Sequence, residues 1–421
     1  MKEKENMRDN PIVAYEKRVI SSIEEYKVVA VLSLIAFPLG AVVAFIEVVF
    51  GRGLMAVTGA RLENPAGWTA FLPLAGVFIA LIYKEFGKGT ERGMALVFDA
   101  AEGKCSIPLR LAPLVIIASW MTHLCGGSAG REGVAVQIGA TLADQAGSRL
   151  SRNKLFENSR DTFVICGIAA GFAGLFQTPF AAIFFSLEVL VCGELKYKSL
   201  FPATIAAFTS YFVAKACGLS GEHVAIHAPE FTLDLLWKLA VLGPVFGTVG
   251  AFFASTLRRT KKFLPVLIPN PVIRTGLFGL ILGILFIALH YGRYSGFGTE
   301  ITHAALTGGK IYAYDWILKL VLTILTLSAG FMGGELTPLF TIGSSLGAVV
   351  AGFLGLPPEF AAALGYSAIF GSATNTFLAP ILIGTECFGA ENLPALVIVC
   401  SVAFFANFNK SIYGSQKKLG I

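Results

Sequence analysis

The stretch Gly126 to Gly139, Gly-Gly-Ser-Ala-Gly-Arg-Glu-Gly-Val-Ala-Val-Gln-Ile-Gly, places the charged pair Arg131 and Glu132 inside otherwise apolar sequence. A charge is costly inside a bilayer, so an ionisable residue there is by default a functional-site hypothesis. The glycines of the stretch let the backbone bend and expose amides where a helix begins, and the positive end of the helix dipole favours an anion there. The stretch therefore predicts an anion site with an acid inside it.

The composition is that of an integral membrane protein. The 421 residues are 55% hydrophobic and 14% charged, with a mean hydropathy of +0.71, against about 45 to 50% apolar and about 25% charged residues in soluble proteins. We attribute the net charge of +6 to cytoplasmic loops under the positive-inside rule, and expect no nucleic-acid partner. The seven cysteines stand singly and predict buried thiols. The dispersed histidines do not favour a metal site, and no cofactor is expected.

Apolar segments divide the chain into two membrane halves. Residues 1–27 are polar and rich in Lys and Arg, which predicts a cytoplasmic N-terminal tail rather than a signal peptide. We assign residues 28–218 to the first membrane half and 235–415 to the second. A connecting loop at 219–234 and a short C-terminal tail at 416–421 complete this division.

Many of the apolar segments are short or broken. Lys27 to Phe50 and Trp68 to Tyr83 approach the roughly 20 residues that a membrane-crossing helix needs. Phe163 to Cys192, in contrast, is divided by three glycines and Pro179. Short, interrupted segments indicate half-helices that meet near the middle of the membrane.

Two charged features receive structural interpretations. Glu47 lies late in the first long segment, and we expect its carboxylate to reach the membrane interface. The basic stretch Arg258 to Lys262 separates two apolar runs and predicts a cytoplasmic loop.

An internal repeat relates the two halves. The paired segments are Gln137 to Leu142 with Thr341 to Leu346, Gly130 with Gly334, and Gly167 to Glu188 with Gly365 to Glu386. The alternative is that glycine-rich membrane helices look alike through small-residue packing alone. An odd number of crossings per copy would invert the copies and bring two glycine-rich helix starts together at midplane. The expected fold is thus an all-α integral membrane protein with two repeated, inverted halves of many tilted and broken helices.

Three motifs carry a resemblance to a known family. Gly-Gly-Ser-Ala-Gly-Arg-Glu-Gly at 126–133, Gly-Gly-Glu-Leu-Thr-Pro at 333–338 and the late Tyr413 resemble the signature elements of the CLC channels and anion/proton antiporters. The resemblance covers about residues 30 to 415. It implies a homodimer in which each subunit has two inverted halves, its own anion pathway and a gating glutamate, here Glu132.

The departures from the chloride-transporting members resemble the fluoride-exporting branch of this family. Gly93-Met94-Ala95-Leu96-Val97 stands where those members carry Gly-Ser-Gly-Ile-Pro, and Val134 stands where many carry proline. Leu336-Thr337 within the second motif is a further departure.

Helix starts and neutral donors are expected to bind the anion. The helices that follow Gly130 and Gly334 would present amides to a dehydrated anion without a full counter-charge. Thr337 offers a hydroxyl as a hydrogen-bond donor, and the alternative for it is a helix cap. Tyr413 offers a phenol, and the alternative for it is an anchor at the membrane interface. Met94 contributes a thioether, which donates no hydrogen bond to chloride. The alternative for Met94 is that it only fills space in the core. The full expected anion-binding set is Met94, Gly130, Arg131, Gly133, Gly334, Leu336, Thr337, Tyr413 and Asn375.

Glu132 is the expected gating and proton-coupling residue. Its carboxylate would mimic the anion and occupy the site, and its neutral form would leave with a proton. Arg131 is expected to neutralise neighbouring acids or carbonyl groups. Glu335 lies at a helix start, where a carboxylate favours the dipole, so we expect a structural role for it.

The proton path differs from that of the chloride-transporting members. Those members carry a pair of acids at the end of the helix that matches Phe180 to Leu190, and the second acid receives the proton on the inner side. This chain has Glu188 followed by Val189, which cannot hold a proton. Glu188 and Glu386 are therefore expected to be helix-terminal structural acids, with a relay role for Glu188 as the alternative, and Glu132 itself would travel.

Together these features predict a secondary active transporter that exports fluoride in exchange for protons. The alternatives are a chloride/proton antiporter, a passive anion channel and a membrane-embedded enzyme. The enzyme is disfavoured because no nucleophile, base and orienting group cluster recognisably. The expected setting is the lipid of a plasma membrane, a bacterial inner membrane, with the N-terminus in the cytoplasm. The chain ends soon after Tyr413, so no soluble regulatory domain is expected.

Overall fold

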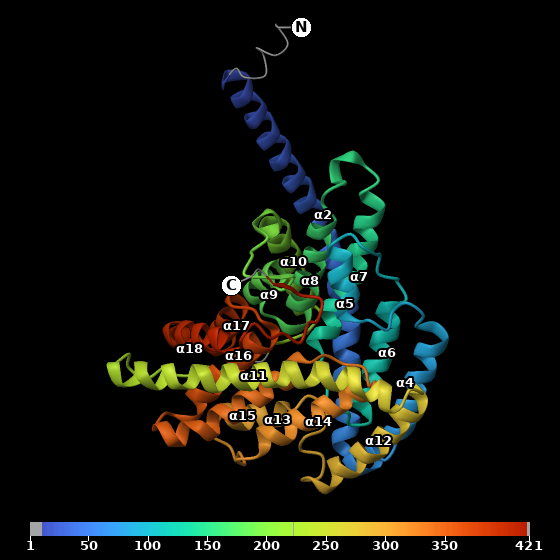
Figure 1. Cartoon of the computed structure of the whole chain (residues 1–421), viewed down its shortest axis with the longest axis vertical. Helices are drawn as coiled ribbons and strands as arrows, with labels where there is room; N and C mark the ends of the chain where they lie inside the picture. The colour runs from blue at the N-terminus through green and yellow to red at the C-terminus, as the bar shows by residue number, and fades with distance from the viewer. Residues whose placement is uncertain (1–10, 222, 419–421) are drawn as a thin grey trace.

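The computed structural model describes residues 11–221 and 223–418, and the ordered structure in these ranges is almost entirely helical (Figure 1). The only strands within them are β1 (Val191–Cys192) and β2 (Lys417–Lys418), two residues each, which pair in parallel. The first nine helices are α2 (Pro11–Glu63), α3 (Pro65–Thr69), α4 (Leu72–Phe86), α5 (Met94–Ala101), α6 (Leu111–Leu124), α7 (Glu132–Leu150), α8 (Arg160–Phe176), α9 (Pro179–Glu188) and α10 (Leu200–Ala216).

The second part of the chain repeats this helical organisation. Its helices are α11 (Leu233–Leu267), α12 (Pro271–Ala288), α13 (Thr299–Leu306), α14 (Asp315–Ala329), α15 (Leu336–Leu354), α16 (Pro358–Thr374), α17 (Leu378–Phe388) and α18 (Leu393–Ala406). Helix α11 crosses the whole of this part in Figure 1 and packs on α16 and α18.

Only some of these helices are long enough to cross a membrane alone. Among the described residues, four helices have the length and apolar composition for it: the Glu24–Glu63 part of α2, then α11, α12 and α15. Several others, such as α6, α9 and α17, are apolar but shorter. The predicted division of Phe163 to Cys192 is confirmed, since α8 ends at Phe176 and α9 begins at Pro179, where the missing N–H of proline costs no hydrogen bond.

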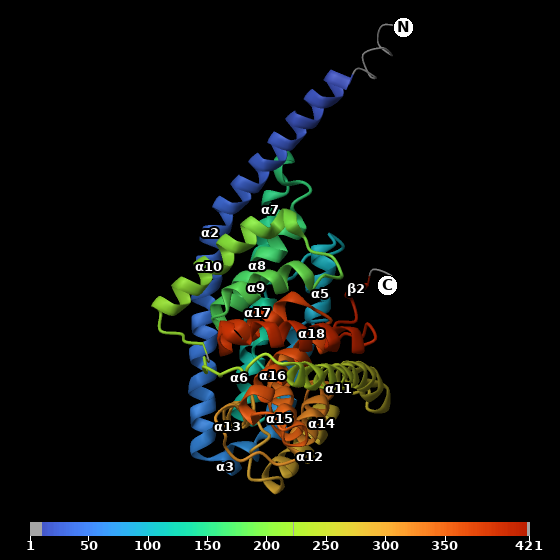
Figure 2. The same cartoon turned by 90° about the vertical axis from the view of Figure 1, so that its left-hand side faces the viewer.

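Helix α2 is longer than the sequence indicated. It includes residues 11–27, which were assigned to the N-terminal tail, whereas residues 1–10 of that tail lie outside the described ranges. Pro38 and Gly40 do not end it. A Cβ atom at Gly40 would lie 2.6 Å from the carbonyl oxygen of Ala206, so this glycine lets α10 lie against α2, as Figure 2 shows.

The expected interfacial position of Glu47 is wrong. Its side chain is fully buried, and neither carboxylate oxygen has a hydrogen-bond partner among the described residues. The reason is that α2 continues to Glu63, so Glu47 lies in the helix interior, where it packs near Gly174 of α8.

The predicted loop at Arg258 to Lys262 is also wrong, because these residues continue α11. Leu257 and Leu264 are both buried and lie seven residues apart, the spacing of one helix face. Burial of that face keeps the basic residues helical, and α11 ends only at Leu267, after Pro265.

Close glycine contacts confirm the internal repeat. A Cβ atom at Gly139 of α7 would lie 2.1 Å from the carbonyl oxygen of Gly167 on α8. The same distance separates a Cβ atom at Gly343 of α15 from the carbonyl oxygen of Gly365 on α16. The pair α7 and α8 in the first half and the pair α15 and α16 in the second half thus approach each other in the same way, backbone against backbone.

The repeat units also exchange equivalent contacts. Glu188, at the end of α9, accepts hydrogen bonds from the amides of residues 377, 378 and 379 at the start of α17, at 3.0, 3.1 and 2.8 Å. Glu386 of α17 accepts in turn from the amides of Phe180 and Ala181 at the start of α9, at 3.1 and 2.8 Å. Such reciprocal capping is what two copies of one motif related by an approximate two-fold axis produce, and it agrees with the predicted repeat and the all-helical fold class.

Candidate functional site

The starts of α7 and α15 meet at a backbone contact between the two halves. The amide of Gly130 donates to the carbonyl of Gly334 at 2.6 Å, and the amide of Gly334 donates to the carbonyl of Gly130 at 2.7 Å. The pair forms an antiparallel bridge. A Cβ atom at Gly130 would lie 2.5 Å from the hydroxyl of Thr337, so only glycine permits this approach.

Glu132 lies between these two helix starts. It is the first residue of α7, and its side chain is fully buried. The hydroxyl of Thr337 donates a hydrogen bond to its carboxylate, and the same hydroxyl accepts from the amide of Arg131 at 3.1 Å. Thr337 is the second residue of α15 and not its N-cap. Its hydroxyl therefore does not cap the helix but donates to the Glu132 carboxylate.

Arg131 balances only part of the negative charge of the Glu132 carboxylate. Its Nε atom lies 3.4 Å from the Glu132 carboxylate, at the long end of a hydrogen bond. Its guanidinium lies over the ring of Phe297, 5.4 Å from the centroid, and that ring lies 4.4 Å from the ring of His123. The carboxylate therefore depends mainly on the hydroxyl and the helix starts.

A cavity of about 630 Å³ reaches the start of α15 through Gly333 and Glu335 and is lined by two more of the predicted residues, whereas Glu132 does not line it. Met94, the first residue of α5, and Tyr413 both line it, together with Phe98 and Gln137. Tyr413 is buried and packs its ring 5.3 Å from that of Phe98. The burial excludes an interfacial anchor, the alternative considered for this tyrosine.

Glu335 connects the cavity with the paired helix starts. Its side chain lines the cavity, and one of its carboxylate oxygens would lie 3.5 Å from a Cβ atom at Gly133. The other carboxylate oxygen lies 2.8 Å from Nζ of Lys261, which also lines the cavity. The sequence indicated only a structural role here, because the lysine partner comes from α11, 74 residues away.

The remaining predicted residues divide into two groups. Leu336 is buried as the first residue of α15, and Gly133 is the second residue of α7, so both belong to the helix starts. Asn375 is not brought to them. It ends α16 in a left-handed conformation and exchanges side-chain hydrogen bonds of 2.8 Å with Asn407 and Asn409, and it lines a separate cavity with Glu188.

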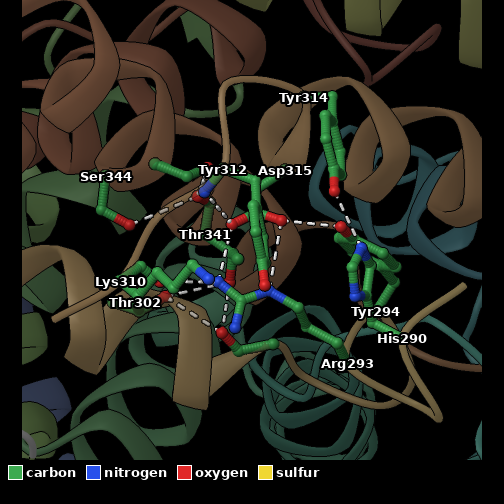
Figure 3. A network of polar contacts seen from close by, with 12 residues as sticks. His290, Arg293, Tyr294, Thr302, Lys310, Tyr312, Tyr314, Asp315, Thr341 and Ser344 are labelled. Carbon is green, nitrogen blue, oxygen red and sulfur yellow. Dashed lines mark hydrogen bonds and ion pairs between the residues drawn. The ribbon is translucent and has the colours of Figure 1, made fainter.

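A polar network that the sequence analysis missed fixes the segment before α13 (Figure 3). The buried carboxylate of Asp315 accepts from Arg293, at 2.6 Å from Nη2, and from the hydroxyl of Tyr294 at 2.7 Å. Lys319, one turn further along α14 and fully buried, donates to the carbonyls of Tyr294 and Gly296, at 3.1 and 2.7 Å.

The same segment contacts the first motif and helix α15. The amide of Gly296 donates to the carbonyl of Gly126 at 3.3 Å, and the hydroxyl of Thr341 donates to the carbonyl of Gly298 at 3.3 Å. Phe297, between these residues, packs against Arg131. The rule that marked Arg131 and Glu132, charge within an apolar run, would also have marked Asp315 and Lys319.

Residues 11–221 and 223–418 contain no group of three or more His, Cys, Asp or Glu side chains placed to hold a metal ion. Five of the cysteines are buried, as predicted, and Cys105 and Cys217 are half-buried.

Comparisons with known proteins agree with this geometry. A family model described as voltage gated chloride channel matches residues 74–407. The chloride/fluoride channel protein of Pseudomonas syringae pv. tomato is 36% identical over 356 residues, which are 82% of this chain and 77% of that protein.

Solved structures extend the likeness to the whole fold. The crystal structure of a CLC-type fluoride/proton antiporter is 46% identical, with a TM-score of 0.90, and the match covers 93% of this chain and 98% of that one. The structure of a slow cyanobacterial Cl⁻/H⁺ antiporter is 20% identical with a TM-score of 0.72, covers 91% of this chain and 94% of that one, and shows a likeness of fold alone.

The family that the motifs at 126–133 and 333–338 resemble is thus the family that the comparisons identify. Its members are transport proteins, which favours transport over the enzyme alternative. With the family model covering most of the chain, this multi-pass membrane protein belongs to the voltage gated chloride channel family, the CLC family.

Proposed function

We propose that this protein exports fluoride in exchange for protons, through a pathway in each subunit that Glu132 gates. The observation that carries the proposal is the hydrogen bond from the Thr337 hydroxyl to the buried Glu132 carboxylate at the two paired helix starts. The carboxylate takes the place that an anion would take, with neutral donors around it.

The chemistry of exchange follows from this position. When Glu132 is protonated, its neutral carboxyl no longer competes for the helix starts, and a fluoride ion can accept hydrogen bonds from the Thr337 hydroxyl and the exposed amides. When the proton is released, the restored carboxylate displaces the anion. One carboxyl group would in this way alternate between holding a proton and excluding fluoride, which couples opposite movements of the two ions.

The cavity favours fluoride over chloride in this proposal. Met94 offers no hydrogen-bond donor, whereas the phenol of Tyr413 is a strong donor that suits a small, hard anion. The relatives named above point the same way, since one is described as a chloride/fluoride channel protein and another as a fluoride/proton antiporter.

Glu188 is excluded from the proton path that we propose. Its carboxylate accepts from three backbone amides of α17 and faces the cavity of Asn375, not that of Met94. Glu132 would therefore travel between the two sides itself, as expected from the apolar Val189. The anion-binding set keeps Met94, Gly130, Arg131, Gly133, Gly334, Leu336, Thr337 and Tyr413, whereas Asn375 is left out because its side chain is engaged elsewhere.

We further propose a homodimer in a bacterial plasma membrane with the N-terminus in the cytoplasm. Large apolar side chains are exposed on α9, α10 and α18, including Phe180, Phe201, Phe212 and Val397. This surface suits lipid or a second copy of the chain, and the resemblance to the family favours the copy. The two membrane halves at 28–218 and 235–415 remain our proposed domain division.

Purified protein in liposomes tests the function directly. A fluoride gradient should drive proton movement, read by a pH-sensitive dye, whereas an equal chloride gradient should drive far less. Equal responses to both ions would favour a chloride/proton antiporter. Fluoride flux without any proton movement would favour a passive channel, and Glu132→Gln serves as the uncoupled reference.

A further inference from the structure

We propose that Lys261 captures the transported anion in the cavity before the anion reaches Glu132, and that Glu335 keeps this capture reversible. The inference rests on the proposed function and adds an anion-recognition residue from α11, an element outside the paired helix starts.

The position of Lys261 distinguishes it from its basic neighbours. Helix α11 carries Arg258, Arg259, Lys261 and Lys262 in one stretch. Of these four, Lys261 is the one that lines the cavity of Met94 and Tyr413. Lys262 is exposed and is not among the lining residues. A general positive surface would be made by all four residues alike, whereas the helix turns one of them toward the proposed pathway.

The ammonium group of Lys261 retains capacity for a second partner. It lies 2.8 Å from a Glu335 carboxylate oxygen, and its side chain is 41% exposed, against 15% for Glu335. A lysine ammonium has three N–H donors, and one contact with Glu335 leaves the others for an anion. A compact ammonium is also a strongly hydrated point charge, which suits a small, hard anion better than a planar guanidinium does.

Among the described residues, the other cations that line the cavity, Lys84, Arg92 and Arg274, form no hydrogen bond or ion pair with the residues at the start of α15. Arg92 lies 2.5 Å from the carboxylate of Asp99, and Arg274 donates to the carbonyls of Ala329 and Ile268. Lys84 and Glu91 complete the charged groups of the lining. Lys261 is thus the cation that shares a carboxylate with the start of α15.

Glu335 prevents the capture from becoming a trap. An unpaired ammonium beside a partly dehydrated anion would hold it strongly, since the attraction grows as water is excluded. The carboxylate at 2.8 Å competes for the same donors. An arriving anion therefore gains one contact while the pair loosens, and the pair re-forms when the anion moves on toward Glu132.

Fluoride titrations of purified protein and initial rates in liposomes test the inference. K261Q should raise the half-saturating fluoride concentration by about ten-fold, the low end of the range over which charges that line a cleft raise the local concentration of an ion. K261R, which keeps the charge, should stay nearer to wild type. K262Q is the matched control from the same stretch and should leave the value unchanged.

Substitution of Glu335 gives a second test of the same interaction. E335Q frees the ammonium and should lower the half-saturating concentration, and the K261Q and E335Q effects should be non-additive because the two residues share one interaction. Calorimetric binding and thermal unfolding in detergent separate anion affinity from stability. If K261Q fails to fold, K261M and the E335Q arm carry the test.

The outcomes are distinguishable. Wild-type liposomes that move no fluoride would overturn the proposed function itself. Wild-type transport with the same half-saturating concentration in K261Q and K262Q would overturn the role of Lys261 and leave the proposed function intact.

Discussion

The hydroxyl of Thr337 in the second half donates a hydrogen bond to the carboxylate of Glu132 in the first half, 205 residues away along the chain. Because the hydroxyl also accepts from the amide of Arg131, its proton is directed at the acid. The contact joins the two inverted copies at one side-chain pair and makes the acid depend on both.

Removal of this hydroxyl should slow coupled transport. Thr337→Val keeps the shape of the side chain but loses a hydrogen bond to a charged group, worth about 1.5 to 3 kcal/mol. This loss corresponds to about a 10- to 150-fold slower fluoride-driven proton uptake. Thr337→Ser is the matched control because it keeps the donor. Wild-type rates in the valine variant, measured with a pH dye in liposomes, would contradict the role of the hydroxyl.

Replacement of the acid should separate binding from coupling. Glu132→Gln mimics only the neutral carboxyl, so fluoride should still bind in a calorimetric titration while fluoride-driven proton uptake is lost. Proton uptake that persists in this variant would show that another group carries the proton.

Substitutions of the capping residues Glu188 and Glu386 should change the stability of the protein more than they change the coupling of proton movement to fluoride movement. Glu188→Gln keeps an oxygen acceptor and should leave the ratio of protons to fluoride largely intact, with Glu386→Gln as the symmetry-related control. Glu188→Ala removes the acceptor and should cost about 1 to 2 kcal/mol of stability, as lost helix caps do. Our account of the proton path is refuted if Glu188→Gln folds and moves fluoride but moves no protons.

Two glycines on α15 offer a steric comparison. Gly343→Ala would place a methyl group 2.1 Å from the carbonyl of Gly365, so α15 and α16 must separate, at a cost of about 1 to 3 kcal/mol. Gly352→Ala on the same helix meets nothing within 4 Å and should be neutral or slightly stabilising, since alanine favours helix. Thermal unfolding in detergent measures both, and equal midpoints would refute the close helix packing.

Much of the fold was accessible from the sequence, because the relevant signals are local or repeated. The proline that begins α9 and the glycines before α7 and α15 are readable from neighbouring residues. The pairing of Gly130 with Gly334 followed from repeat symmetry, which converts one recognised motif into a prediction about its partner.

The features that the sequence did not predict depend on distant contacts. Burial of Glu47 follows from the full length of α2 and its packing on α8, and the pairing of Lys261 with Glu335 follows from the continuation of α11 past its basic residues. Asp315 and Lys319 hold a segment that α13 and a loop separate from their own helix, so no pattern within α14 shows their partners.

The crossed contacts between the two halves have a mechanical consequence. Gly130 and Gly334 share two backbone hydrogen bonds, and Glu188 and Glu386 each bind the amides of the opposite copy. Rocking one half against the other, a common way for transporters to alternate access, would break all of these contacts at once. We expect the frame to stay still while access changes, so that the moving part is about the size of one glutamate side chain and each transport cycle requires little rearrangement of the surrounding lipid.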